Sequence, residues 1–474
     1  MHAREARRAE MWGAWLGAAA AALPMALFWG FSVDDALITA RVAAHIANGF
    51  GHRFNIGGPI VDAVTPLGFE YVLAPFAGRG PLAALYFAKW LGAACGVAVG
   101  AWIGRRVATS GNGRERFFVL APLAVSSPFA AWCVCGMETG VVLGLATIAL
   151  SSLPLAALSA GLAAALRPEL VPYATVLAVG RGIAARRSPA HLARALLSAT
   201  TPAAVVAIVR KAVFGHAAPL AVWAKPSDFA HGARYLAVCL LWTGAPLLVA
   251  APRALAKLDR ESRAVLAALA AHSAAIVVVG GDWMPLCRLF VPALPALFLV
   301  GARLAPVTRP WSTWLRAGAA TSVSVLLLVK QAPAARHVLD QRLALVADAR
   351  PALAGAERVA TVDVGWVGAA TDATVVDLAG VTDDFVAHLP GGHTSKHLPS
   401  RFVETRNIDA LVLLCDDPKS TECGDDRWDR VVEYRVARQS AELGFVVRAK
   451  LELRGTAKQY LVLRRKESVV SDQN

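Results

Sequence analysis

Long apolar runs separated by short, arginine-rich segments occupy residues 1–331. They begin near residues 11, 82, 117, 138, 155, 169, 194, 235, 264, 288 and 315. A helix that crosses a bilayer needs roughly 20 apolar residues, and several of these runs are shorter. The pattern predicts an α-helical polytopic membrane protein with about eleven spans. Residues 1–31 also resemble a signal peptide, but we favour a retained first helix because further apolar runs follow.

The pattern changes after about residue 351, where short apolar stretches alternate with turn-rich segments. We expect a β-strand in each of ERVATVDVG, ATVVDLAG, IDALVLLCD, LGFVVRAKLEL and KQYLVLRR. The sequence therefore predicts two domains, a transmembrane domain over residues 1–331 and an α/β domain with a leading helix over residues 332–474. The second domain has no glycine-rich nucleotide motif, so we assign it no nucleotide.

Composition supports the membrane interpretation. The 474 residues are 56% hydrophobic, and the mean hydropathy is +0.49, which is too apolar for an ordinary soluble protein. A net charge of +14 often indicates nucleic-acid binding. Here the arginines lie in short loops without interleaved aromatic residues, so we expect membrane lipid as a partner and no nucleic acid.

The distribution of charge predicts the orientation. If the N-terminus is cytoplasmic, the inner loops hold more arginine and lysine than the outer ones, as the positive-inside rule requires. This predicts a multi-pass protein of the inner (plasma) membrane with a periplasmic or extracytoplasmic C-terminal domain. Carboxylates then collect at the outer boundary, which favours chemistry at that interface. They are Asp34, Asp35, Asp62, Glu70, Glu138, Glu169, Asp228 and Asp282.

The long first outer loop begins with VDDALITARVAAHIANGFGHRFN. Asp34, Arg41, His45 and Asn48 share one face at helical spacing, which predicts an amphipathic helix lying on the membrane surface. The adjacent carboxylates Asp34 and Asp35 leave two interpretations open. They are the N-cap of this helix, or they are the acidic centre of an enzyme.

Several motifs follow one another in a familiar order. They are Asp34-Asp35 with Arg41, Asn55, the segment Thr65-Pro66-Leu67-Gly68, Cys135-Gly136-Met137-Glu138-Thr139, Leu166-Arg167-Pro168-Glu169, Lys225, Gly280-Gly281-Asp282 with Arg288, and Asp363-Val364-Gly365. In this order they resemble the membrane glycosyltransferases of the C-type superfamily. The most similar branch contains the terminal arabinofuranosyltransferases of mycobacterial cell walls. The serine and tryptophan that this branch carries near Thr65, and an asparagine and threonine before Lys225, are absent here.

The resemblance implies an inverting glycosyltransferase. Its donor would be a polyprenyl-phosphate-linked sugar, with an arabinofuranosyl group favoured over mannose or aminoarabinose. Its acceptor would be a glycan, lipid or protein of the cell envelope. Two interpretations from other classes remain, a flippase or transporter for lipid-linked sugars and a noncatalytic scaffold.

Such a transfer needs a base for the acceptor hydroxyl and cations for the departing phosphate. We expect Asp34 to be the base, with Asp35 as its partner. Lys225, Arg288 and Arg41 are the predicted phosphate-binding cations, and snorkelling at the membrane interface is the alternative for Lys225. Further substrate-binding candidates are Asn55, Thr65, Glu138, Arg167, Glu169 and Asp282, and Arg167 has the alternative of a structural ion pair with Glu138 or Glu169.

Two further expectations concern a metal and a disulfide. The carboxylate oxygens of Asp34, Glu138 and Asp282 are suitable ligands for a divalent cation, although their spacing in the sequence is not that of a metal-binding motif. Cys415 and Cys423 lie close together in CDDPKSTEC of the predicted outer domain. In an oxidising compartment they are expected to form a disulfide.

Overall fold

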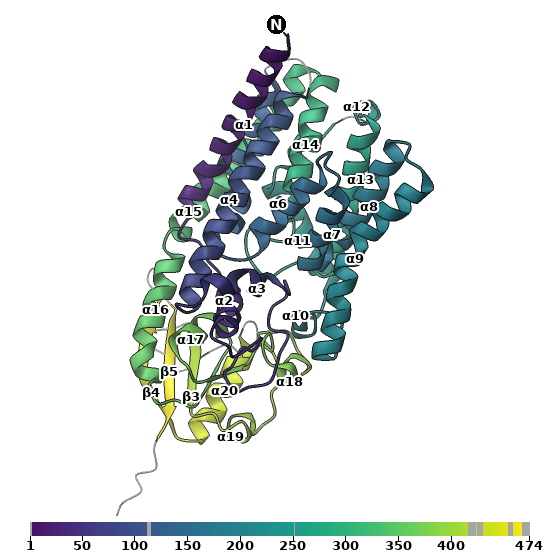
Figure 1. Cartoon of the computed structure of the whole chain (residues 1–474). Coiled ribbons are helices and arrows are strands. Elements are labelled where there is room, and N and C mark those ends of the chain that lie inside the picture. Colours follow the sequence, from purple (N-terminus) through teal and green to yellow (C-terminus); the bar gives the residue numbers. More distant parts are fainter. Residues whose placement is uncertain are drawn as a thin grey trace, which may run out of the picture.

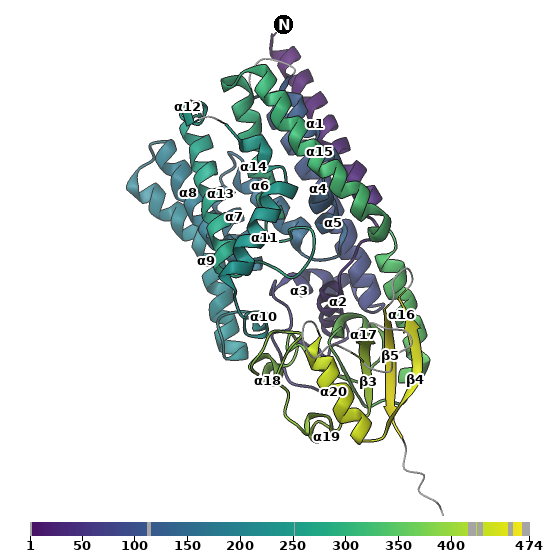
Figure 2. The same ribbon diagram turned by 180° about the vertical axis from the view of Figure 1, so that it is seen from behind.

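The computed structural model describes residues 2–110, 115–250, 252–415, 423, 430–453 and 458–466. An elongated helical body carries the N-terminus at one end and a small sheet domain at the other (Figure 1). Both views place α2 (Asp34–Ala47), α3 (Phe69–Leu73) and α10 (Leu220–Ala224) where these two parts meet (Figure 2). The chain therefore combines a mostly helical body with a C-terminal domain that contains a β-sheet, as the sequence predicts.

The helices of the body differ widely in length. The long ones are α1 (His2–Leu27), α4 (Pro81–Ala108), α9 (Pro189–Phe214), α13 (Arg260–Val278) and α15 (Pro310–Ala335). The shorter ones are α5 (Ser127–Val134), α6 (Thr139–Ala149), α7 (Ala156–Leu166), α8 (Val171–Ala184), α11 (Phe229–Trp242), α12 (Pro252–Leu255) and α14 (Leu294–Leu304). Proline in the first turn begins many of them, because its missing N–H would have no partner there in any case.

Among the described residues, four helices are long and apolar enough to cross a membrane: α4, α9, α13 and the stretch Pro310–Leu353. A fifth is formed if Phe117–Val125 and Ser127–Val134, which meet at 58°, count as one bent span. The prediction of about eleven spans is not confirmed, because several apolar runs form helices shorter than the roughly 20 residues a span needs. Examples are Thr139–Ala149, Ala156–Leu166 and Val291–Val307.

Glycine allows α1 and α4 to pack with their backbones in contact. A Cβ atom at Gly13 would lie 2.5 Å from the carbonyl oxygen of Gly104. One at Gly17 would overlap the carbonyl oxygen of Gly100. Small residues one turn apart on both helices are typical of close packing inside membranes, where no hydrophobic force drives helices together.

Helix α2 forms where the sequence predicts it, but it is not a surface helix. Its residues from Ala36 to His45 are all buried, and it packs against α4 on one side and α17 (Val364–Ala370) on the other. The predicted polar face is buried because Arg41 and His45 bond to backbone carbonyl groups instead of water. The prediction that this helix lies on the membrane surface is therefore wrong.

The sheet domain contains five strands in the order β2-β1-β3-β5-β4. They are β1 (Arg358–Thr361), β2 (Thr374–Asp377), β3 (Ala410–Cys415), β4 (Phe445–Glu452) and β5 (Gln459–Arg465). Strand β1 runs parallel to β2 and β3, and β5 is antiparallel to β3 and β4. Each strand lies within a segment for which the sequence predicts one. The central strand β3 is buried along its whole length, as its uninterrupted apolar sequence requires.

Helices surround this sheet. They are the leading helix α16 (Val338–Leu353), α17, α18 (Asp384–Ala387), α19 (Phe402–Thr405) and α20 (Val431–Glu442). Helix α15 ends at Ala335, so the predicted domain boundary after residue 331 falls inside its last turn. The leading helix therefore continues almost directly from a membrane-type helix.

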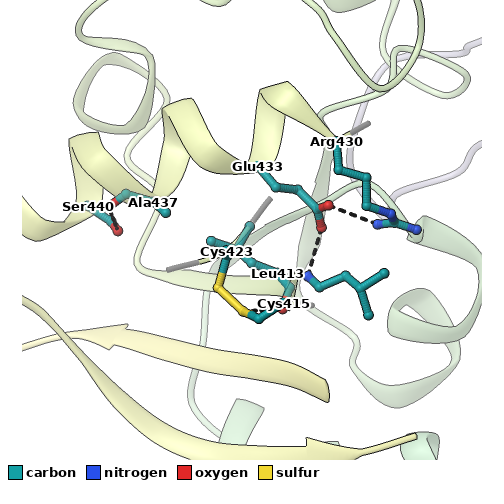
Figure 3. Close-up of a disulfide and its surroundings, with 8 residues drawn as sticks. Leu413, Cys415, Cys423, Arg430, Glu433, Ala437 and Ser440 are labelled. Carbon is teal, nitrogen blue, oxygen red and sulfur yellow. Dashed lines mark hydrogen bonds and ion pairs between the residues drawn. A yellow bond between two sulfur atoms is a disulfide. The ribbon is translucent and has the colours of Figure 1, made fainter. Parts of the chain in front are cut away.

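A disulfide joins Cys415, at the end of β3, to Cys423, as the sequence predicts (Figure 3). Beside it, the Glu433 carboxylate accepts a hydrogen bond from Arg430 at 3.0 Å (Figure 3). It accepts another from the Leu414 backbone N–H at 2.9 Å. The disulfide therefore lies next to a buried, fully bonded carboxylate in the domain core.

Candidate active site

A cavity of about 400 Å³ lies where the helical body meets the sheet domain. Its walls come from α2, the segment 63–66, the turn 167–169 before α8, the segment 219–227 around α10 and the segment 278–289, with Val381 added by the sheet domain. Several of the residues that the sequence analysis selected line it together. They are Asp35, Thr65, Arg167, Glu169, Lys225, Asp282 and Arg288.

The segment 280–288 folds back on itself to form one wall. Leu286 and Cys287 both have φ of 60°, and two successive non-glycine residues in this region are uncommon and tend to occur at functional sites. The bend returns Arg288 to Asp282, and Arg288 Nε donates to Asp282 Oδ2 at 2.6 Å. Backbone strain therefore accompanies a charged pair that faces the cavity.

The charged groups of the cavity influence one another. Burial acts to raise the pKa of Asp282, but the positive charges of Arg288 and Lys225 outweigh it and leave the pKa below its usual value. Burial acts to lower the pKa of Arg288, and the negative charges of Asp282 and Asp35 outweigh it and raise that pKa. Asp35 and Lys225 thus lie within electrostatic range of the Asp282–Arg288 pair.

Asp35 and Lys225 differ from the other charged groups in lacking partners. Within the part of the chain that the structure describes, neither side chain has a hydrogen bond or an ion pair. Asp35 lies in the first turn of α2, and Lys225 directly follows α10. One carboxylate and one ammonium group therefore face the same cavity with their bonding capacity unused.

A second charged cluster lies behind the turn 167–169. Arg167 Nη1 is 3.3 Å from Glu138 Oε1, and Arg167 Nε is 3.0 Å from Glu169 Oε1. These distances are those of ion pairs, but the contacts do not have hydrogen-bond geometry. Among the described residues, both Glu138 oxygens and Arg167 Nη2 are buried without a hydrogen-bond partner. The cluster therefore has the structural ion pairs that the sequence offers as the alternative role of Arg167. Several of its buried donors and acceptors have no hydrogen-bond partner among the described residues.

Asp34, the predicted base, does not line the cavity. Its Oδ2 accepts from the Gly365 backbone N–H at 2.7 Å, and its Oδ1 accepts from that of Trp366 at 2.9 Å and from Arg342 Nη1 at 3.0 Å. It therefore binds the first turn of α17, and the residue at the N-cap position of α2 is Val33. Burial raises the pKa of Asp34 to about 6, against the lowering effect of Arg342. Asp34 therefore does not cap its own helix, and its assignment as the base stays a prediction.

Arg41 and Asn55 are also structural. Arg41 Nε donates to the Phe54 carbonyl oxygen at 2.8 Å, and its Nη1 donates to the carbonyl oxygens of Gly368 and Thr371. The Asn55 side chain exchanges two hydrogen bonds of 2.9 Å with the backbone of β2. Their polar atoms bond to backbone groups, largely of the sheet domain, and neither residue lines this cavity. Their predicted roles in binding phosphate and substrate stay predictions.

Other residues of the site had no signal in the sequence. Thr39 and Ser227 add hydroxyl groups to the cavity, and Arg342 holds Asp34 from α16. An isolated hydroxyl residue forms no pattern, and nothing in the sequence connects residue 342 with residue 34. The described residues contain no group of three or more histidine, cysteine or acidic side chains placed to hold a metal ion. The divalent cation considered from the sequence therefore has no such site within those residues.

Comparison with known families gives one match. Residues 336–463 match a family described as a domain of unknown function, DUF8728. The matched region begins at the end of α15 and reaches into β5, so it coincides with the leading helix and the sheet domain. No curated protein matches the chain. The match thus marks the sheet domain as a recurring unit and leaves its activity open.

Proposed function

We propose that this protein is a membrane glycosyltransferase that uses a polyprenyl-phosphate-linked sugar as donor. The observation that carries the proposal is that the Asp35 carboxylate and the Lys225 ammonium line one cavity, both without a hydrogen bond or ion pair among the described residues. A displacement at an anomeric carbon needs a base on one side and a cation for the leaving phosphate on the other. An arabinofuranosyl donor remains favoured by the sequence resemblance.

In the proposed step, the acceptor hydroxyl oxygen attacks the anomeric carbon while Asp35 takes the hydroxyl proton. The bond between that carbon and the phosphate oxygen breaks, and its electron pair leaves with the polyprenyl phosphate. Attack opposite the leaving group inverts the anomeric configuration. Asp35 replaces Asp34 as the base because its carboxylate faces the cavity without a partner among the described residues, whereas both Asp34 oxygens are bonded.

The phosphate would lie between Lys225 and Arg288. The Arg288 side chain is already bonded to Asp282, so the ammonium group of Lys225 is the cation with capacity to spare. Asp282 would hold Arg288 in position, and Arg167 with Glu138 and Glu169 would support the opposite wall. A charge-assisted contact of this kind is shorter and stronger than a neutral one.

The edge of the cavity suits a lipid chain. Val222, Val278 and Trp283 line it and remain 55%, 56% and 61% exposed, respectively. Val278 is also the last residue of α13, a candidate span, so this edge lies where that helix ends. A prenyl chain could therefore stay among lipid tails while its phosphate reaches Lys225. In the proposed orientation this end of the body and the sheet domain are extracytoplasmic, with a cytoplasmic N-terminus.

Native mass spectrometry of the protein purified with its own membrane lipids tests the proposal. Wild type is expected to carry a polyprenyl-phosphate sugar, and Asp35→Asn is expected to accumulate it because binding survives while proton removal fails. Lys225→Met should weaken binding about tenfold to a hundredfold, as expected for the loss of a charged contact. Lys330→Met, an exposed position on α15, is the matched control and should bind like wild type.

The absence of such a lipid from both folded wild type and Asp35→Asn would contradict the proposal. Binding that is equal in Lys225→Met and wild type would remove this lysine from the site. Retained turnover in Asp35→Asn would leave the transferase in place and remove Asp35 as its base. Donor binding without any transfer in wild type would favour a transporter of lipid-linked sugars.

A further inference from the structure

A second cavity, of about 670 Å³, lies beside the candidate active site. It is bounded by the segment 55–62, the end of α9 and the edge of the sheet domain around β2 and α18. Its charged or titratable lining residues are Asp62, His216, Arg358, Asp383, Asp384 and Arg406. None of them takes part in the proposed transfer step.

The two cavities are neighbours along two stretches of chain. Asp62 lines the second cavity, and Ala63, the next residue, lines the first. Thr382 lines the second cavity, and Val381 lines the first. At these two places only a single segment of backbone separates the second cavity from the cavity that Asp35 lines.

The second cavity contains buried polar atoms that are not satisfied within the described protein. Asp62 is 2% exposed, and its Oδ2 accepts from Arg210 Nε at 2.9 Å, but its Oδ1 has no partner among the described residues. The same holds for Nε of Arg358. Buried polar atoms are nearly always bonded, so one unused acceptor and one unused donor on residues that line this cavity are unusual, and the wall holds hydrogen-bonding capacity that the described protein does not use.

The charges of the cavity indicate a neutral ligand. Asp62 is paired with Arg210, and Asp383 lies 3.4 Å from Arg406. Arg358 and Asp384 add one charge of each sign, so the negative charges of the carboxylates equal the positive charges of the guanidinium groups. A free phosphate or another anion would meet as much repulsion as attraction here.

The apolar part of the wall is aromatic. Phe385 is 49% exposed, with the guanidinium carbon of Arg406 4.9 Å from its ring centre, and Phe214 also lines the cavity. A flat apolar face beside donors and acceptors binds a molecule that has hydroxyl groups on its edge and C–H groups on its faces. Saccharides have this chemistry.

We infer that the second cavity binds the saccharide part of the acceptor. This inference rests on the proposed transferase function, because it places the acceptor next to the base. The non-reducing end would reach the Asp35 cavity past residues 62 and 63, and the preceding sugar units would lie against Phe385. A site that hydrogen-bonds hydroxyl groups discriminates against molecules without them, so this cavity would select the acceptor.

Saturation-transfer NMR on the full chain in lipid nanodiscs tests the inference with defined probes. These are α-linked arabinofuranosyl and mannosyl oligosaccharides of two to four units, with glycerol 3-phosphate as the anionic comparison. At least one oligosaccharide is expected to bind. Val213→Trp fills the cavity from α9, where Val213 is 52% exposed and lines the wall, so the change deletes no buried contact.

Val213→Trp is expected to weaken oligosaccharide binding at least tenfold. Val209→Trp, one turn earlier on α9 and 42% exposed, lies outside the cavity lining and should bind like wild type. Asp62→Asn should weaken binding in the same direction. Failure of every oligosaccharide to bind, equal binding by Val213→Trp and wild type, or preferred binding of glycerol 3-phosphate would each overturn the inference.

The outcomes separate this inference from the proposed function. Saccharide binding that Val213→Trp blocks, in a protein that holds no polyprenyl phosphate, would retain the cavity as a saccharide site and reject the transferase. Polyprenyl-phosphate binding with no saccharide binding would retain the donor site and reject the second cavity.

Discussion

Replacing Asp34 with asparagine tests whether this residue joins the two domains or performs chemistry. In the wild type its carboxylate accepts backbone hydrogen bonds of 2.7 and 2.9 Å from α17 and a third of 3.0 Å from Arg342. Asparagine keeps one acceptor oxygen, loses the negative charge and turns an NH2 group toward a backbone N–H. Hydrogen bonds to charged groups contribute about 1.5–3 kcal/mol each.

The expected loss of stability is therefore about 2–4 kcal/mol, since one backbone bond and the partly buried ion pair are removed. We expect a lower unfolding temperature in detergent and faster hydrogen exchange at the amides of Gly365 and Trp366. Both differences should be larger at pH 5 than at pH 7.5. Burial raises the pKa of the Asp34 carboxyl from 3.8 to about 6, so wild type gains stability as the pH falls from 6 toward 4, whereas Asp34→Asn, which does not titrate, gains none.

Turnover separates the two roles of this acidic pair. Folded Asp34→Asn should keep turnover within about tenfold of wild type, whereas Asp35→Asn should lose about a hundredfold or more, as expected for a general base. A stable Asp34→Asn protein without turnover would refute the reasoning and restore Asp34 as the base.

Three further predictions concern stability. Gly17→Leu should separate α1 from α4, because a Cβ at this position overlaps the opposite backbone. The expected loss in free energy of unfolding is about 1–3 kcal/mol, measurable as a lower unfolding temperature and as aggregation in detergent. Cys423→Ser should remove a link that closes a short loop, with a separation of 8 residues, and cost about 2–3 kcal/mol without reductant. Burial raises the pKa of Asp377 from 3.8 to about 6, so its stabilising contribution is complete below pH 4 and is lost as the pH rises to 6. That shift corresponds to about 3 kcal/mol, and Asp377→Asn should flatten this part of the profile of unfolding temperature against pH.

Each of these predictions has a clear contrary result. Wild-type stability of Gly17→Leu would mean that the helices do not pack through these glycines. An unchanged unfolding temperature of Cys423→Ser, compared with wild type before and after reduction, would show that the disulfide contributes nothing. A wild-type pH slope in Asp377→Asn would assign the slope to another buried carboxyl group, and Glu433, whose pKa burial raises to about 7, is the next candidate.

Local patterns were sufficient for the elements of this protein. The apolar runs predict a helical membrane protein, the alternation after residue 351 predicts the strands, and the spacing of Cys415 and Cys423 predicts their disulfide. These inferences succeed because helix period, strand alternation and loop length depend on residues that are close in sequence. The predicted number of spans was not confirmed for the same reason. Whether a short apolar helix crosses the membrane or packs inside the body depends on its neighbours.

Only the tertiary structure decided which side chains of the candidate site are bonded and which face the cavity. Asp34 and Asp35 are chemically identical, and successive residues on a helix point roughly 100° apart. One carboxylate therefore binds α17 and the other faces the cavity. Arg41 looked like a free cation, but it is bonded to backbone carbonyl groups, two of them more than 300 residues away in the sequence. The sequence determined which charged residues were available, and the packing of the sheet domain on α2 determined which of them remained unpaired.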